Sequence, residues 1–183
     1  DLVMGAVPPN LILRDTTDKN WQDFYSLDKE FVILYFWDPE CGHCKKITPK
    51  LQTLYEKKFR DRNIEIFAVG KAVGEDFDKW KAFIYKNNLE FINVAVTDDL
   101  YTKAMEDARQ FVPKYTTLKS LNYQKTYDIF ATPKMWVLDK DKKIIAKSLT
   151  ISQLEDFIDR LQEKEDSEKI FPPEENKEDE QMH

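Results

Sequence analysis

The sequence predicts an α/β fold in which a central mixed sheet is flanked by helices. Residues 31–37 form a continuous run of β-branched and aromatic side chains, which is typical of a strand buried on both faces. Apolar residues then recur at helical spacing from Ile47 to Phe59. A strand, a helix and another strand follow up to residue 96, which predicts a right-handed crossover and a parallel core. A turn at 139–142 joins the last two strands as an antiparallel hairpin, so the sheet is mixed.

The elements around this centre follow from periodicity and turn signals. Phe77, Trp80, Ile84 and Tyr85 share the apolar face of one expected helix. In chain order we expect a lead-in at 1–9, an N-terminal hairpin at 10–27, a strand at 63–70, a helix at 75–88, an extended segment at 91–96, a strand after residue 133, a strand at 144–146 and a closing helix over 151–161.

Residues 98–125 form an insert that is polar and rich in tyrosine. A single short helix is indicated within it, by Leu100, Ala104, Met105 and Ala108. Inserts near a site are common places for partner-specific contacts, and a surface elaboration without a specific role is an equal alternative.

Length and charge limit the class of protein. The chain has 183 residues, enough for one domain with its own core, and a formal net charge of −6. Segment 165–183 holds eight acidic residues and two lysines, which also makes −6, so the remaining body is formally neutral. We expect no surface that attracts nucleic acid and no membrane span, because no apolar run approaches the roughly 20 residues that cross a bilayer.

From residue 165 the apolar pattern ends, and charged residues with Pro172-Pro173 predict a disordered acidic tail. Ile170-Phe171 is the exception and fits either a docking segment or a last packed turn. The expected organisation is a lead-in at 1–9, one domain at 10–164 and a tail at 165–183. The sequence has no basic-then-apolar leader, and by itself it indicates neither a compartment nor an oligomeric state.

The two cysteines, Cys41 and Cys44, lie where the buried strand passes into the amphipathic helix. A helix N-terminus presents unpaired N–H groups and the positive end of the helix dipole, so we expect a stabilised thiolate and a lowered pKa at Cys41. A protonated His43 adds to this effect. Cys44 lies one turn further in and is more shielded. The arrangement predicts a redox pair in which Cys41 attacks a disulfide and Cys44 resolves it.

Other uses of the cysteines fit less well. A zinc site needs about four ligands, whereas this stretch offers two thiols and His43. Covalent haem attachment needs a histidine after the second cysteine, and Lys45 stands there. We therefore expect neither a metal nor a cofactor.

The stretch from Trp37 to Pro49 resembles the active site of the thioredoxin superfamily. The matching positions are Phe36, Trp37, Cys41, Gly42, His43, Cys44, Lys45, Ile47 and Pro49. The Gly-His dipeptide is typical of protein disulfide isomerases. Thr132-Pro133 resembles the family's cis-proline segment, which faces the cysteines and precedes an antiparallel strand.

This resemblance implies a thioredoxin-like fold over residues 5–164, with a hairpin and an insert similar to those of the TlpA/ResA-like branch. It implies exchange with protein thiols and disulfides, supported by an upstream thiol reductant. A partner chain would pair with the backbone of Thr132 beside Pro133. The resemblance also implies a cell-envelope setting, which in a bacterium is the periplasm.

Two positions depart from the family pattern. Tyr35 stands where thioredoxin has a buried aspartate, and Ile47 stands where ResA-like proteins have a glutamate. Neither usual acceptor for the Cys44 proton is therefore present.

Three residues are expected to modulate the pair. Glu40 stands where thioredoxin has its second tryptophan, and it either tunes Cys41 electrostatically or is an exposed loop acid. His43 as an imidazolium stabilises the reduced form and so makes the disulfide more oxidising. Trp37 is expected to form part of the active-site wall and to report the redox state by fluorescence.

Two other functions fit parts of the sequence. The hairpin also occurs in peroxiredoxin-like chains, which suggests a thiol peroxidase, but those proteins have a threonine where Asp38 stands, three residues before Cys41. The other alternative is a non-catalytic partner-binding domain. Within thiol–disulfide exchange the direction stays open, because the branch favours a reductase and the Gly-His dipeptide favours an isomerase or oxidant.

Overall fold

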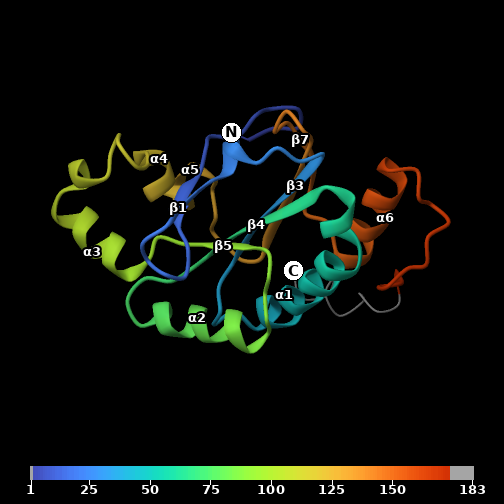
Figure 1. Ribbon diagram of the computed structural model, residues 1–183, viewed down its shortest axis with the longest axis horizontal. Helices are drawn as coiled ribbons and strands as arrows, with labels where there is room; N and C mark the ends of the chain where they lie inside the picture. The colour runs from blue at the N-terminus through green and yellow to red at the C-terminus, as the bar shows by residue number, and fades with distance from the viewer. Residues whose placement is uncertain (1, 174–183) are drawn as a thin grey trace.

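The computed structural model describes residues 2–173 and is built on a five-stranded mixed sheet of order β5-β4-β3-β6-β7 (Figure 1). The central strand β3 (Phe31–Trp37) runs parallel to β4 (Ile64–Gly70), and β4 runs parallel to β5 (Ile92–Val94). On its other side β3 pairs antiparallel with β6 (Lys134–Leu138), which pairs antiparallel with β7 (Ile144–Lys147). The predicted fold class is confirmed.

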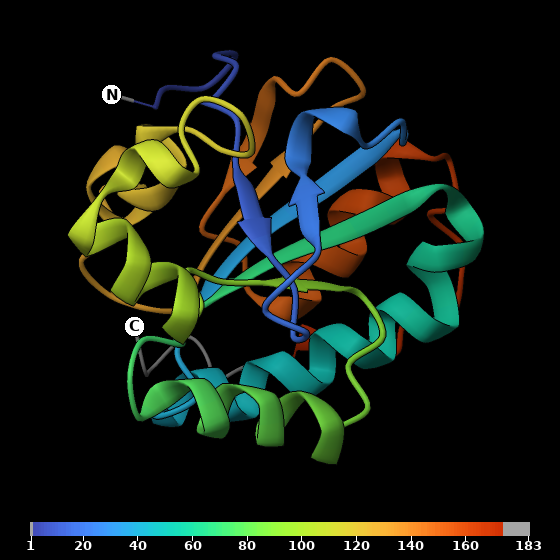
Figure 2. The same ribbon diagram turned by 60° about the vertical axis from the view of Figure 1, so that its left-hand side comes forward.

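Every residue of β3 is buried, and successive side chains enter two different cores. The odd-numbered residues pack with α1 (Gly42–Leu54), α2 (Asp76–Lys86) and α6 (Ile151–Leu161). The even-numbered residues pack with β1 (Ile12–Arg14) and with the insert before β6. Figure 2 shows the hairpin in front of the sheet and α6 behind it. A strand buried on both faces, as predicted, thus fixes the position of the chain where α1 begins.

The N-terminal hairpin is formed as expected, by β1 and β2 (Trp21–Asp23), and η1 (Phe24–Ser26) follows it. The insert contains more helix than predicted, because α3 (Asp98–Glu106) is followed by η4 (Ala108–Gln110), α4 (Leu118–Leu121) and α5 (Tyr123–Thr126). Helices of four residues, such as α4 and α5, are too short for periodicity to reveal. The local signal of α4 is Thr117, whose hydroxyl accepts the N–H of Ser120 as an N-cap.

Two residues that we assigned to apolar helical faces are exposed. Tyr85 in α2 is 65% exposed and Met105 in α3 is 71% exposed. Trp80, Ile84 and Leu100 fill the cores as predicted. Tyr85 and Met105 each follow an inward residue by one position, which turns them by about 100° away from it on the helix.

Residues 165–173 fold back on α6, which differs from the disordered tail expected after residue 164. The buried carboxylate of Glu155 accepts the backbone N–H groups of Ile170 and Phe171, each at 2.8 Å. Both side chains pack against the core under α1 and α6. Of the two interpretations of Ile170-Phe171, the structure therefore shows the last packed turn. The rest of the predicted tail lies outside the described residues, and the domain limits stay a prediction.

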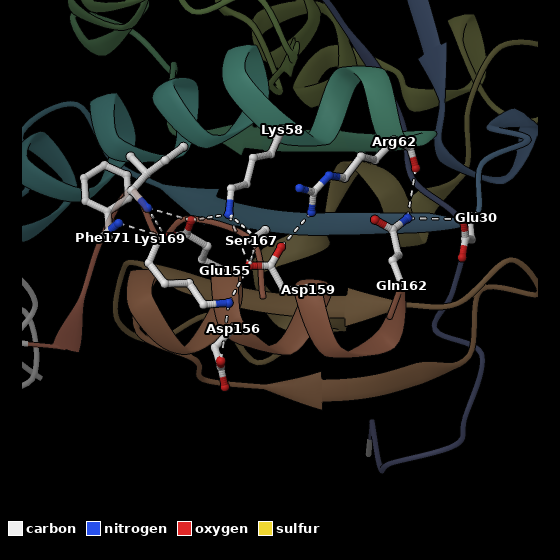
Figure 3. A network of polar contacts seen from close by, with 11 residues as sticks. Glu30, Lys58, Arg62, Glu155, Asp156, Asp159, Gln162, Ser167, Lys169 and Phe171 are labelled. Carbon is white, nitrogen blue, oxygen red and sulfur yellow. Dashed lines mark hydrogen bonds and ion pairs between the residues drawn. The ribbon is translucent and has the colours of Figure 1, made fainter. Parts of the chain in front are cut away.

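A buried lysine connects this segment with the active-site helix. The chain continues from α1 through a π-helical turn, η2 (Tyr55–Phe59), and then η3 (Arg60–Arg62). In Figure 3 Lys58 reaches between Glu155 and Asp159 of α6, and its Nζ lies 2.5 Å and 3.1 Å from their carboxylate oxygens. Arg62 lies 2.6 Å from the other oxygen of Asp159. Burial opposes the charge on Asp159, but hydrogen bonds from the C-terminal segment, Arg62 and Lys58 outweigh it and hold its pKa well below the usual range.

Lys58→Met is expected to lower the free energy of unfolding by about 3–5 kcal/mol, because two buried carboxylates lose the ammonium group they share. Denaturant unfolding at neutral pH measures the loss. Lys57→Met, at the exposed neighbour, is the control and is expected to stay within about 0.5 kcal/mol of wild type.

The pH dependence of this loss has a defined sign. Because the pKa of Asp159 is lowered by folding, its stabilisation is present above the unfolded pKa and is lost as the pH falls toward the folded value. The difference in free energy of unfolding between Lys58→Met and Lys57→Met should therefore become smaller below about pH 4. Equal stability of the two variants at neutral pH would contradict a stabilising role for the network.

Candidate active site

Cys41 and Cys44 lie at the junction of β3 and α1, as predicted. Cys41 is the N-cap of α1, and its sulfur accepts the backbone N–H of Cys44 at 3.3 Å. The loop is held by two backbone bonds of 3.0 Å, from the Cys41 N–H to the carbonyl of Asp38 and from the Lys45 N–H to the carbonyl of Cys41. Both cysteines are free thiols, and Cys41 is partly exposed whereas Cys44 is buried. Of the two sulfurs, that of Cys41 is the one a partner can reach.

The two thiols differ in acidity. Burial raises the pKa of Cys44 to about 12. Burial acts in the same direction on Cys41, but hydrogen bonds from the side chain and backbone of Cys44, from Thr132 and from the His43 backbone outweigh it and lower the pKa. The asymmetry agrees with the predicted division of labour, in which Cys41 attacks first.

The loop before β6 brings Thr132 and Pro133 beside the cysteines. The Thr132–Pro133 peptide bond is cis, and the Thr132 carbonyl accepts a hydrogen bond from the Cys41 thiol at 3.4 Å. These residues are 91 positions apart in the sequence, and the pairing of β3 with β6 brings them together. The proximity that the resemblance implied is therefore found, and substrate binding by this loop stays a prediction.

Below the cysteines, Tyr35 is bonded into the active-site helix. Its hydroxyl lies 2.7 Å from Thr48 Oγ1, which donates to the carbonyl of Cys44 at 2.7 Å. Because the single Thr48 proton goes to that carbonyl, Tyr35 is the donor to Thr48. Tyr35 thus ties the Cys44 backbone to the sheet. Sequence analysis missed Thr48, although a threonine inside a helix and directly before Pro49 is the local signal of such a bond to the carbonyl four residues earlier.

Glu40 is exposed and forms an ion pair with Lys79 of α2, at 2.6 Å. A hydrogen bond and the positive charge of Lys79 lower the pKa of Glu40. Of its two interpretations, the exposed loop acid has direct support, and the tuning of Cys41 stays a prediction.

His43 and Trp37 are both buried. His43 is 6% exposed and follows Gly42 in the first turn of α1. Trp37 packs on Phe83, with ring centroids 5.2 Å apart. Gly70 lies opposite Trp37 in the sheet and has no room for a side chain, since an added Cβ would lie 2.3 Å from the Trp80 indole nitrogen. Trp37 is therefore a buried core residue at the end of β3, and its roles in the active-site wall and as a redox reporter stay predictions.

Two clefts flank the loop that carries Thr132. The larger has a volume of 630 Å³ and is lined by Tyr35, His43 and Pro133 among others. The smaller has a volume of 160 Å³ and lies between Phe130 on one side and the end of β3 on the other. Thr132 lines both, so the loop separates two hollows beside the reactive sulfur.

Within residues 2–173, no three or more histidine, cysteine, aspartate or glutamate side chains are grouped in a way that could hold a metal ion. Across the same residues no helix combines the length and the apolar character that crossing a bilayer requires.

A mixed sheet of this order, a Cys-Gly-His-Cys motif at the start of the helix after its central strand, and a cis-proline beside it define a thioredoxin-like protein. The sequence pattern of the thioredoxin-like family matches residues 28–144. The chain belongs to this family.

Individual relatives narrow the comparison. Thiol-disulfide oxidoreductase ResA of a Bacillus cereus strain is 26% identical over 161 residues, which cover 86% of this chain and 78% of that protein. A solved domain of a possible thiol-disulfide isomerase from Cytophaga hutchinsonii is 31% identical, with a TM-score of 0.67 over 88% of this chain and 95% of that one.

The thioredoxin domain of a thiol-disulfide oxidoreductase from Bacteroides vulgatus shares the fold, with a TM-score of 0.68 at 22% identity over 88% of this chain and 99% of that one. The expected resemblance to TlpA/ResA-like thiol–disulfide oxidoreductases is confirmed, and the predicted enzyme class with it.

Alkylation of the reduced protein is expected to separate the two thiols. The rate at Cys41 should rise with pH through an apparent pKa below the value of about 8.5 for a free cysteine and then level off. Cys44 should stay unmodified up to about pH 10, because burial raises its pKa to about 12. Peptide mapping after timed iodoacetamide treatment measures both rates in one sample. Parallel labelling of the two cysteines would contradict the asymmetry.

Proposed function

We propose that this chain catalyses thiol–disulfide exchange with partner proteins through Cys41 and Cys44. The observation that carries the proposal is the Cys41 sulfur, which caps α1 and accepts the Cys44 N–H at 3.3 Å while the Cys44 side chain stays buried. A thiol whose pKa is lowered in this way provides more of the nucleophilic thiolate at a given pH. Its neighbour is shielded until a mixed disulfide has formed.

The exchange proceeds in two steps. The Cys41 thiolate attacks one sulfur of a partner disulfide, the partner's S–S bond breaks, and the other partner sulfur leaves as a thiolate that takes up a proton. Cys44 then loses its proton and attacks the Cys41 sulfur, which releases the second partner thiol. The partner gains two electrons and the pair becomes a disulfide. Because burial raises the pKa of Cys44 to about 12, loss of its proton is the demanding part.

The surroundings of this reaction are part of the proposal. The Thr132 backbone beside Pro133 holds the partner chain by β-type pairing, and an upstream thiol reductant restores the pair. For the location we propose the cell envelope, in a bacterium the periplasm, on the resemblance to TlpA/ResA-like proteins. The direction of electron flow is left open between a reductase and an isomerase or oxidant. The curated relative is named an oxidoreductase, and the solved domain is named a possible isomerase.

No feature of the described residues specifically supports either alternative function. Asp38 stands where a thiol peroxidase would have its threonine, and its backbone carbonyl accepts the Cys41 N–H. A non-catalytic binding domain would not need one acidic thiol and one shielded thiol.

Insulin-disulfide reduction tests the proposal. With dithiothreitol as reductant, wild type is expected to accelerate the reaction and Cys41→Ala to return it to the uncatalysed background, because the attacking sulfur is gone. Cys44→Ala should still attack and should accumulate a mixed disulfide through Cys41, visible by non-reducing electrophoresis. A wild-type rate equal to background would favour the binding domain, and stoichiometric consumption of peroxide would favour the peroxidase.

The reduction potential tests the role of His43. His43→Gln removes the imidazole and keeps the backbone N–H that stabilises the Cys41 thiolate, whereas His43→Pro removes both. Each change should destabilise the reduced form, so the potential should fall from wild type to His43→Gln and further to His43→Pro. A fall on the order of 30 mV per step corresponds to about tenfold in the exchange equilibrium. Equal potentials in a glutathione titration would rule out this role.

A further inference from the structure

An aromatic side chain beside the reactive sulfur is left uncovered. Phe130 is 89% exposed, more than any other large apolar side chain among the described residues. Burying a phenylalanine side chain is favourable, so an exposed one forgoes that stabilisation unless a partner covers it. Singly exposed apolar residues are common on protein surfaces, so Phe130 is distinguished by its position two residues before Thr132, whose carbonyl contacts the Cys41 sulfur.

The exposure of Phe130 does not come from a loose chain. The N–H of Ile129 donates to the carbonyl of Gln124 at 2.7 Å, and the N–H of Phe130 donates to the carbonyl of Asp128 at 3.1 Å. Ile129 packs against the core beneath the insert, so the loop is anchored with Ile129 inward and Phe130 outward. The preceding Asp128 adopts a left-handed backbone, with φ of 53°, which turns the chain at this point.

Phe130 also lies within reach of the chemistry. It precedes by two residues Thr132, whose carbonyl accepts a hydrogen bond from the Cys41 thiol at 3.4 Å. Two residues of extended chain span at most about 7 Å. A partner that brings its own sulfur to Cys41 therefore places the residues next to its cysteine against the Phe130 side of the loop.

The small cleft supplies a place for one of those residues. Its 160 Å³ are bounded by Ile129 and Phe130 from the loop and by Trp37, Asp38 and Lys71 from the ends of β3 and β4. A volume of this size is several times the roughly 30 Å³ share of one water molecule, so it accommodates a side chain. The Lys71 ammonium lies 4.0 Å from the Asp38 carboxylate and 3.7 Å from the Asp76 carboxylate, so the charged groups of the wall are paired with one another, and Ile129 and Phe130 supply its apolar part.

We propose that Phe130 and the 160 Å³ cleft form a specificity site for an apolar side chain next to the reactive cysteine of an extended partner segment. The proposal rests on the proposed function and adds the class of partner to it. Alternate side chains of an extended segment point to opposite sides, so pairing with the Thr132 backbone sends neighbouring residues into the two clefts that this loop separates. Apolar contact with Phe130 then selects among cysteine-bearing segments.

The test uses a mixed disulfide between a short peptide and an aromatic thiol, with Cys44→Ala as the background so that the product accumulates. The Cys41 thiolate attacks the peptide sulfur, a Cys41–peptide disulfide forms, and the aromatic thiolate, the better leaving group, is released and followed by its absorbance. Two peptides are compared, with leucine or with serine at both positions next to cysteine. The symmetric aromatic disulfide without peptide reports the intrinsic reactivity of Cys41.

Phe130→Ser is expected to slow the reaction with the leucine peptide about five- to tenfold and to leave the serine peptide and the aromatic disulfide unchanged. Phe130→Leu should keep most of the rate advantage of the leucine peptide over the serine peptide. Met105→Ser, a change at another exposed apolar residue outside the loop, is the matched control and should change none of the rates.

Two results would overturn the inference while leaving the proposed function intact. One is an unchanged leucine-to-serine ratio in Phe130→Ser. The other is a concentration-dependent dimer in sedimentation that Phe130→Ser dissociates, since a second copy would then be what covers the side chain. Failure of the unsubstituted background to react even with the aromatic disulfide would instead contradict the proposed function, and this inference with it.

Discussion

The hydrogen bond from the Cys44 N–H to the Cys41 sulfur is the contact on which the rest of the site depends. A hydrogen bond to a charged group stabilises the charged form, so this bond lowers the pKa of the Cys41 thiol. Burial at Cys41 works against the charge, and the pKa of Cys41 is lowered because this bond and its companions outweigh burial. Strand β3, buried on both faces, and the bond of Thr48 to the Cys44 carbonyl hold the geometry of these bonds from opposite sides.

The hydroxyl of Tyr35 gives this site a different balance from one with a buried carboxylate. A carboxylate below the cysteines would repel a thiolate and raise its pKa, whereas Tyr35 adds no charge and donates its hydrogen bond to Thr48. In the resolution step of the proposed exchange, Cys44 has to lose its proton without a buried carboxylate to accept it. In the proposed exchange such a balance favours attack over resolution, and a mixed disulfide that persists would make the proposed contacts between the loop at Thr132 and the partner more important.

Much of the fold followed from the sequence where the signals are local and strong. The run 31–37 and the motif at Cys41 each carry a pattern that does not depend on distant residues, whereas the cis-proline at 133 followed from the family resemblance. The sequence did not reveal helices α4 and α5, because four residues are too few to show a helical period. Tyr85 was wrongly assigned to the buried face of its helix, because an aromatic residue beside an apolar stripe looks like part of that stripe. The packing of Ile170 and Phe171 depends on Glu155 and Lys58, which are charged residues that the sequence indicates as surface. Likewise the partner of Glu40, Lys79, is contributed by another helix.

Titration of both cysteines in one reduced sample, followed by the NMR shifts of their labelled Cβ atoms, tests the central relation most directly. We expect the Cys41 signal to move with an apparent pKa below about 8.5. The Cys44 signal should show the onset of ionisation only toward the pKa of about 12 that burial produces. Two signals that move together, or a Cys44 signal that moves first, would contradict a site organised around a thiolate at the start of α1.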